Sequence, residues 1–174
     1  MAISGIPEVI NDFNVYLSGN KLIGLTGEVA LPEFEGMTET ISGPGILGEF
    51  ESTVTGRYSS MEQEIPFRIL SVDIFKMIDT TTPVELTLRG AQQYTVASTG
   101  AQDEMGMRIV FRGRCKKLTP GTVKQGGTMD SSITLELTYI LIEVDGTKKV
   151  ELDKINGVFK LNGVDKLAKV RKYT

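Results

Sequence analysis

Four segments of the chain alternate apolar and polar residues with a period of two, which is the repeat of a β-strand with one buried and one exposed face. In the second of them, Val84–Arg89, the apolar residues Val84, Leu86 and Leu88 alternate with polar ones. The other three segments are Met61–Leu70, Met107–Lys116 and Ile133–Tyr139, and their apolar faces include Ile69, Phe111 and Tyr139, respectively. This pattern predicts antiparallel strands, so we expect a mainly β fold, a β-sandwich or open barrel with one short α-helix.

The polar residues of the four segments would share one face of such a sheet. They carry both signs of charge and would lie close enough for cross-strand pairing. The charged members are Glu62, Glu64, Arg68, Glu85, Arg89, Arg108, Arg112, Arg114, Lys116 and Glu136. Two interpretations stay open: a solvent-facing wall, or the polar inside of a barrel that several copies complete edge to edge, which would also remove exposed strand edges.

The sequence predicts one helix, over Ser71–Asp79, with Ser71 placed to cap it. Helical spacing relates the apolar residues Val72, Phe75 and Ile78, helped by Ile74, and Pro83 ends the pattern five residues after Ile78. A helix of this length is marginal by itself, so we expect its apolar stripe to pack against the sheet.

A glycine-rich segment, Gly36–Gly56, contains five glycines and alternates weakly on either side of its Gly-Pro-Gly centre. It predicts a long hairpin or arm that protrudes from the body. Thr119–Thr128 is typical of the loop of another extended hairpin, and Thr147–Leu152 and Val158–Leu161 of two short strands next to Asp-Gly and Asn-Gly turns. The length of 174 residues fits one domain, which we take to span 1–174.

The composition argues against enzymatic chemistry. The chain has no histidine, which excludes histidine-based nucleophile systems and the usual zinc sites, and its one cysteine, Cys115, is expected to be a small buried hydrophobe. Glutamate pairs two residues apart, such as Glu62 and Glu64, are best explained by solvated strand faces; a hydrolase that uses them is a distant alternative. The glycine spacings match no phosphate-binding loop. We therefore expect no catalytic residues, no cofactor and no metal.

Charge is distributed unevenly along the chain. Residues 1–65 carry ten acidic residues against two basic ones, a net charge of −8, whereas residues 66–174 carry 17 basic residues against 12 acidic ones, a net charge of +5. If the two parts face different directions, copies would attract one another head to tail. The first residues, Met1–Pro7, have neither the cationic nor the apolar region of a secretory signal, so we expect synthesis in the cytoplasm.

The order of these features resembles that of the major tail tube proteins of contractile-tailed phages and phage-tail-like bacteriocins. The resemblance is carried by Val9–Leu17, Gly27–Phe34, the glycine-rich arm, Met61–Ile69 and the helix after it, and it extends through Arg108–Lys116 and Ser131–Val144. It therefore covers most of the chain and includes no catalytic motif.

The resemblance implies a structural subunit of hexameric rings, in which each copy donates four long strands to a continuous inner β-barrel. The rings would stack into a hollow tube inside a contractile sheath, as a virion tail or a released tail-like particle. The arm of each subunit would reach the neighbouring ring, and its contact residues would be Ser42, Gly43, Pro44, Gly45, Ile46, Leu47, Glu49 and Phe50. The lumen wall would consist of Glu62, Glu64, Arg68, Glu85, Arg89, Arg108, Arg112, Arg114 and Glu136. Lumens in this family are polar and often acidic, and the arginines depart from that pattern.

The resemblance also implies partners. They are further copies of the chain, a sheath protein, a tape-measure protein, and baseplate and tail terminator proteins. In a phage, DNA would pass through the lumen without sequence-specific binding; in a bacteriocin, the tube would puncture a membrane and leak ions. The alternative function is a monomeric ligand-binding β-barrel, which would need an apolar interior with aromatic side chains where this chain would place charged ones.

Overall fold

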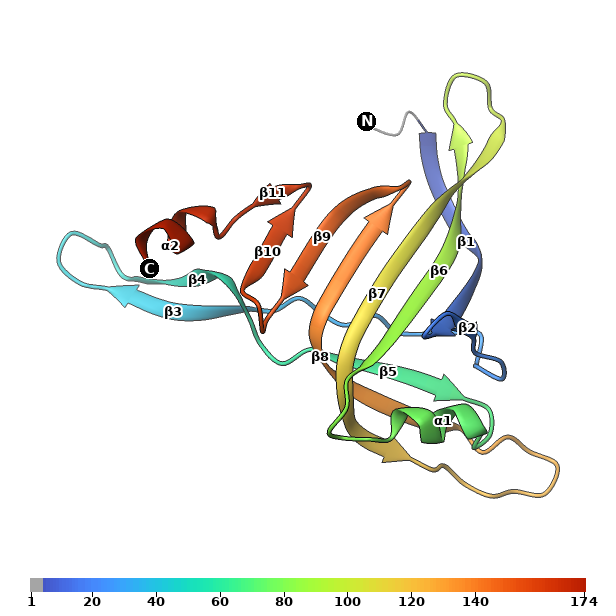
Figure 1. Cartoon of the computed structure of the whole chain (residues 1–174). Helices are drawn as coiled ribbons and strands as arrows, with labels where there is room; N and C mark the ends of the chain where they lie inside the picture. The colour runs from blue at the N-terminus through green and yellow to red at the C-terminus, as the bar shows by residue number, and fades with distance from the viewer. Residues whose placement is uncertain (1–4) are drawn as a thin grey trace.

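The computed structural model describes residues 5–174 and is mainly β, as predicted (Figure 1). Residues 1–4 lie outside the described residues; they belong to the N-terminal segment that is expected to lack a secretory signal. The elements are β1 (Gly5–Leu17), β2 (Asn20–Lys21), β3 (Gly36–Ser42), β4 (Glu49–Tyr58), β5 (Glu62–Phe67), α1 (Val72–Met77), β6 (Val84–Val96), β7 (Gln102–Thr119), β8 (Ser131–Val144), β9 (Thr147–Asp153), β10 (Val158–Leu161), β11 (Val164–Asp165) and α2 (Ala168–Tyr173). The chain thus has a second short helix, α2, where the sequence predicts only one.

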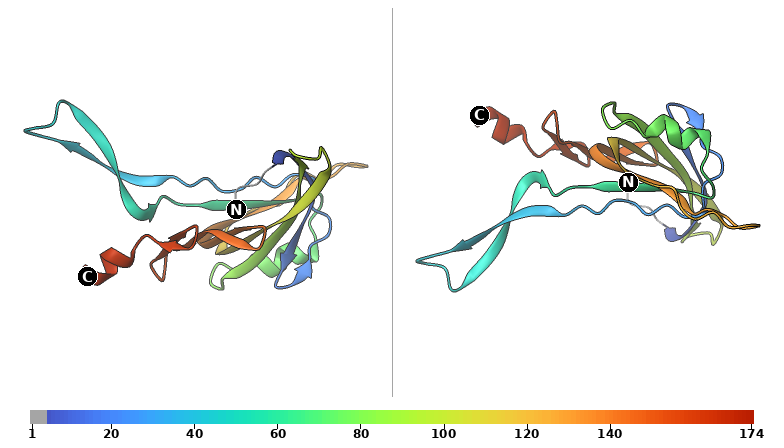
Figure 2. Two further views of the ribbon diagram at one scale, coloured as in Figure 1. Left: turned by 90° about the horizontal axis from the view of Figure 1, so that it is seen from above. Right: turned by 90° about the horizontal axis from the view of Figure 1, so that it is seen from below.

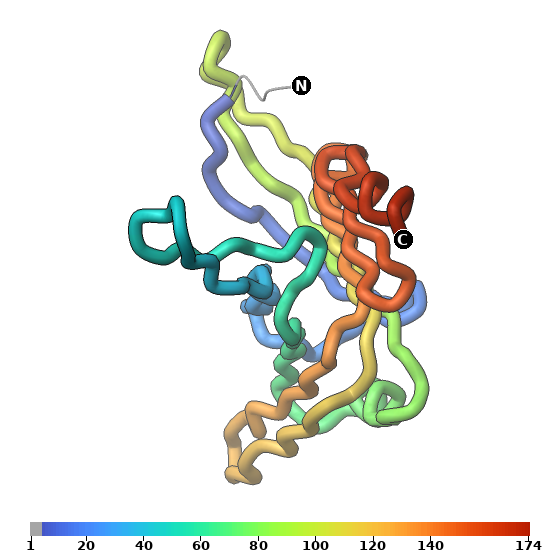
Figure 3. Tube along the Cα trace, turned by 90° about the vertical axis from the view of Figure 1, so that its left-hand side faces the viewer, coloured from blue at the N-terminus to red at the C-terminus, as the bar shows by residue number. Residues whose placement is uncertain are grey.

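One nine-stranded sheet forms the body of the molecule. Its strand order is β11-β10-β9-β8-β7-β6-β1-β2. β5 pairs with the first half of β8, on the same edge of β8 that β9 occupies along the second half. All of these pairings are antiparallel. The sheet is strongly curved and its two ends do not meet (Figure 1, Figure 3). β3 and β4 form a separate two-stranded sheet.

Three of the four predicted strands are longer than the sequence pattern indicates, and one is shorter. β6, β7 and β8 have 13, 18 and 14 residues, whereas β5 has only six and ends at Phe67. Ile69, predicted on the apolar face of that strand, lies outside it and is exposed. β1 supplies the fourth long strand of the wide sheet, with 13 residues.

The hydrophobic core lies on one face of the sheet. Ile109 and Phe111 of β7 and Ile133 and Leu135 of β8 are buried there, together with Phe67 of β5. The segment between β2 and β3 crosses this face and is held to β5, because buried Gln63 donates through Nε2 to the carbonyl oxygen of Ala30 at 2.8 Å. The opposite face of the sheet is free to carry polar side chains.

A bulge in β8 changes which face the second half of this strand presents. Arg112 lies opposite Tyr139 and Gly113 opposite Leu137, so Thr138 is an extra residue. Tyr139, predicted on the apolar face with Leu137, therefore lies on the polar face. Gly113 makes the bulge possible, because a Cβ atom there would lie 2.2 Å from the Glu136 carbonyl oxygen.

Helix α1 packs on the body with a different face from the one predicted. Ile74 and Met77 are fully buried, whereas Val72, Phe75 and Ile78 point to solvent. Ser71 occupies the N-cap position as predicted, but its side chain makes no capping hydrogen bond. The predicted packing is therefore wrong for Val72, Phe75 and Ile78, whereas Ile74, which the predicted stripe includes, is buried together with Met77.

The β3–β4 hairpin is the predicted arm, and it projects far from the body (Figure 2). Its base is fixed by aromatic packing: the ring of Tyr58 lies edge-on to Phe34 at 5.9 Å and to Phe159 of β10 at 5.4 Å between centroids. Its tip is a six-residue turn in which Gly45 and Gly48 have φ of 89° and 99°, a backbone conformation that favours glycine.

Candidate functional site

The polar face of the sheet carries a network of cross-strand ion pairs. Its central row runs Glu85, Arg112, Tyr139, Asp153 across β6 to β9, each residue directly opposite the next. Arg112 donates to Glu85 at 2.9 Å, and its guanidinium carbon lies 4.8 Å from the centroid of the Tyr139 ring. Arg112 is therefore held from both sides by neighbouring strands.

Two further rows are paired in the same manner. Lys116 forms an ion pair with Glu62 of β5 and lies 3.6 Å from Glu136 of β8. On the other side of the central row, Arg108 donates to Glu143 at 3.0 Å. Acids of adjacent strands within the same chain thus neutralise three of the cations on this face, which accounts for arginines on a wall expected to be polar.

Most of the predicted wall residues lie together on this face. Arg89 is directly opposite Arg108, Arg114 is opposite Glu136, and Glu64 follows Glu62 on the exposed side of β5. Arg68 is the exception. It follows the end of β5 and donates through Nε to the carbonyl oxygen of Leu25 at 3.4 Å.

Sequence reasoning missed several polar residues of this face, among them Tyr139, Glu143, Glu151 and Asp153. Glu143 lies beyond the predicted strand Ile133–Tyr139. Glu151 lies on the predicted short strand Thr147–Leu152, which the sequence pattern does not place in the same sheet. Tyr139 donates its hydroxyl to Glu151 at 3.1 Å. Only the glycine at position 113, next to a broken alternation, could have indicated the bulge that turns Tyr139 to this face.

The environment of the face shifts the pKa values of Lys116 and Tyr139 upward. The hydrogen bond to Glu62 raises the pKa of Lys116, which favours its charged form. Burial, reinforced by the nearby charge of Glu151, raises the pKa of Tyr139 to about 12. Both groups therefore keep their protons throughout the neutral range.

The predicted arm residues all lie at the hairpin tip. Ser42 is the last residue of β3, Glu49 and Phe50 begin β4, and the turn between them contains the rest. Leu47 is completely exposed, and Phe50 and Ile46 are also exposed. The tip thus combines apolar side chains with acidic ones and makes no contact that would bury them within the described chain.

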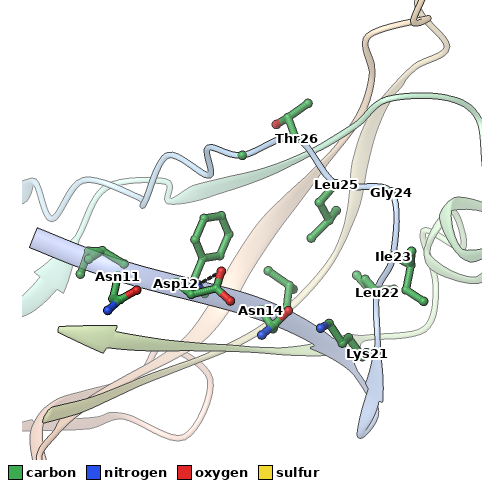
Figure 4. Close-up of a pocket in the computed structure, with 13 residues that line it drawn as sticks. Asn11, Asp12, Asn14, Lys21, Leu22, Ile23, Gly24, Leu25 and Thr26 are labelled. Atoms are coloured by element: carbon green, nitrogen blue, oxygen red, sulfur yellow. Dashed lines mark hydrogen bonds between the residues drawn. The ribbon is translucent and has the colours of Figure 1, made fainter. Parts of the chain in front are cut away.

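A hollow of about 610 Å³ lies between β1 and residues 21–27 (Figure 4). Its charged side chains are Asp12 and Lys21, and Asp12 accepts a hydrogen bond from the backbone N–H of Phe13 at 2.8 Å. Two isolated charges do not form a catalytic arrangement. Cys115 is buried, and burial raises the pKa of its thiol, so it is a core side chain rather than a nucleophile.

Residues 5–174 contain no group of three or more Asp, Glu or Cys side chains that could hold a metal ion. No helix in that part of the chain is long and apolar enough to span a bilayer.

Comparison with known proteins identifies the family. The model of a family described as phage tail tube protein FII matches residues 7–173. The chain belongs to this family of phage tail tube proteins. The tail tube protein of Escherichia phage P2 is 31% identical to it over 169 residues, which are 96% of each chain. The major tail tube protein of Serratia phage KSP20 is 24% identical over 158 residues, 91% of this chain and 90% of the relative.

As a tail tube protein, the chain is a structural component of a virion or tail-like particle and not an enzyme. Its fold is also that of a solved structure. A chain of the sheath/tube terminator of PVC, an extracellular contractile injection system in its extended state, superposes with a TM-score of 0.54 at 14% identity, covering 79% of this chain and 96% of that one.

The tail tube fold does not fit the alternative of a monomeric ligand-binding barrel. The sheet has ends at β2 and β11 and does not close on itself, and its apolar face is filled by packed side chains. Its other face is charged. A calyx for an apolar ligand instead needs a closed sheet with an apolar interior that side chains leave unfilled.

Proposed function

We propose that the polar face of the sheet lines the lumen of a tube built from stacked hexameric rings, with the whole chain acting as one tail tube domain. The observation that carries the proposal is that this face is uncovered and carries cross-strand ion pairs on either side of a small apolar patch of Val110 and Leu141, while the main core cluster lies on the other face. In the tube, β1, β6, β7 and β8 would be the four strands that each copy adds to a common inner barrel.

The ion pairs suit a conduit for a polyanion. Free arginines on a wall would bind DNA phosphates and impede its passage. Arg108, Arg112 and Lys116 already face carboxylates of the same chain, which lowers their attraction for phosphate. The wall would therefore be wet and nearly neutral, so that DNA passes without sequence-specific binding.

The arm supplies the second element of the proposal. It extends beyond the body, its base is anchored by Tyr58, and its tip exposes Leu47 and Phe50. An anchored apolar tip is suited to contact another copy, and we assign to it the contact between successive rings.

The remaining partners follow from the same proposal. Both curated relatives named above belong to phages, which favours a DNA-carrying tail over a DNA-free particle. The protein would be made in the host cytoplasm and assembled with sheath, tape-measure, baseplate and terminator proteins.

Negative-stain microscopy of the purified protein at raised concentration tests the proposal. We expect rings and tubes for the full chain. We expect folded subunits or single rings, but no tubes, after deletion of 42–50, because this tip lies outside the core. Persistent monomers of the full chain, even beside an initiating baseplate, would overturn it. Loss of the circular dichroism signal in the deletion variant would contradict the assigned role of the arm.

A further inference from the structure

The outer side of helix α1 is an apolar stripe with no cover in the described chain. Val72, Phe75 and Ile78, here called the α1 stripe, lie three residues apart and so share one side of the helix. Val72 is 75% exposed and Phe75 is 55% exposed. The helix does not need these side chains for its own packing, because Ile74 and Met77 are already fully buried. Three apolar side chains in a row along α1 and its C-cap residue therefore indicate a contact with something outside this chain.

The arm tip is the matching unpartnered surface. Leu47 is fully exposed, and Ile46 and Phe50 lie on either side of it. The tip protrudes as a narrow hairpin end, which can enter a surface that a flat face could not. Both surfaces thus offer a few large apolar side chains and leave them in water in the isolated subunit.

The two surfaces lie at opposite ends of the molecule. In Figures 1 and 2 the arm extends to one side of the body, and α1 with the β7–β8 loop lies on the other. A contact between different surfaces at opposite ends is heterologous, so each copy can give its tip to one neighbour and receive the tip of another. Repeating this contact adds copies without limit, which is what a stack of rings needs.

One cation beside the α1 stripe is available to an acidic arm. A hollow of about 320 Å³ next to the helix is lined by five charged residues, Lys21, Asp73, Lys76, Asp79 and Glu85, of which Glu85 pairs with Arg112. Lys76 pairs with Asp73 at 2.9 Å, and Asp79 accepts hydrogen bonds from Thr81. Lys21 has no ion pair within residues 5–174 and can meet a carboxylate from another chain. The arm tip carries such groups at Glu49 and Glu51.

We infer that the α1 stripe of one copy receives the arm tip of a second copy in the next ring. The inference rests on the proposed stacking role of the arm and adds the surface on which it docks. Burial of Leu47 and Phe50 against Val72 and Phe75 supplies the affinity, and the acidic flanks of the tip, next to Lys21, fix its orientation.

Cross-linking inside assembled tubes tests this contact. A double variant with Leu47→Cys and Phe75→Cys is assembled and treated with a short bis-maleimide; the native Cys115 is buried. We expect a ladder of covalently linked copies, with at least about tenfold more dimer than in a control pair, because the contact holds the two thiols together. The control combines Leu47→Cys with Ile155→Cys, an apolar residue in the β9–β10 turn that is 73% exposed.

Substitution of the stripe gives a second readout. Phe75→Asp should leave the circular dichroism spectrum unchanged, because the side chain is exposed, but yield separate rings instead of tubes. Ile155→Asp should form tubes like the unmodified chain. If tubes form but the Leu47 and Phe75 thiols do not cross-link, or if Phe75→Asp stacks normally, the docking inference is overturned and the proposed function stands. If the unmodified chain forms no tubes, the proposed function itself fails.

Discussion

Arg112 shows how the charged face is held at the level of single residues. Its guanidinium donates to Glu85 on one neighbouring strand and lies over the ring of Tyr139 on the other. The Tyr139 hydroxyl in turn donates to Glu151. Exposed pairs of this kind each contribute little to stability, about 0.2–1 kcal/mol, so their main effect is to fix where the charges lie.

Tyr139 gives this network a dependence on alkaline pH. Its pKa is about 12 in the folded chain against 10.0 for the free side chain, so the unfolded chain loses this proton first as the pH rises. Deprotonation then stabilises the unfolded chain relative to the native state, so the free energy of unfolding falls between pH 10 and 12. Tyr139→Phe should lose stability less steeply in this window. Urea midpoints measured at intervals across it check the slope, and Tyr173→Phe, outside the sheet, is the control that should follow the unmodified chain.

At the scale of elements, the bulge in β8 decides which side chains reach the polar face. Gly113 is where β7 approaches Glu136 too closely for any Cβ atom. Gly113→Ala should push the strands apart and lower the free energy of unfolding by about 1–3 kcal/mol, the usual cost of overpacking. Gly106→Ala, also in β7, would meet nothing within 4 Å and should be neutral or slightly stabilising. Chemical denaturation of the two variants distinguishes them, and equal stabilities would show that the bulge can relax freely.

The base of the arm gives a second prediction at this scale. Tyr58 contacts both Phe34 and Phe159, so Tyr58→Ala should free the arm from β10, whereas Tyr58→Phe keeps the ring contacts. Trypsin cleavage after Arg57, the exposed residue beside it, should become faster in the alanine variant and stay unchanged in the phenylalanine variant. Equal cleavage of both would mean that other contacts, such as that of Gly56 with Leu167, orient the arm.

The sequence predicts the elements better than the faces they use. Alternation found β6, β7 and β8 because each runs regularly over many residues. β1 was seen only as a short N-terminal segment, since register shifts after Pro7 and Ile10 break its alternation. β11 and α2 are too short to show a period. The side of α1 that packs, and the face of Tyr139, depend on neighbouring strands that a pattern in one segment does not contain.

At the scale of the whole molecule, the charge imbalance along the chain does not divide the fold into an acidic and a basic end. Glu62 from the acidic part pairs with Lys116 from the basic part on one sheet face. The basic C-terminal helix α2 lies on the same side of the body as the acidic arm (Figure 1). Attraction between copies must therefore come from local surfaces, such as the arm tip, rather than from an overall dipole.

The orientation of the subunit in a tube can be tested by chemical access to the polar face. Arg89 is exposed there and forms no ion pair within the described residues, so Arg89→Cys should disturb neither fold nor network. Before assembly, the thiol should react with both a small maleimide and one carried on a bulky polymer. In tubes whose lumen this face lines, the small reagent still enters, whereas the bulky one is excluded and its labelling should fall strongly.

Glu64→Cys, at a position of β5 on the same polar face, should show the same labelling pattern as Arg89→Cys. Undiminished labelling of both positions by the bulky reagent in tubes would place the charged face on the outside of the tube. The face would then not line the lumen, and its ion pairs could not serve DNA passage.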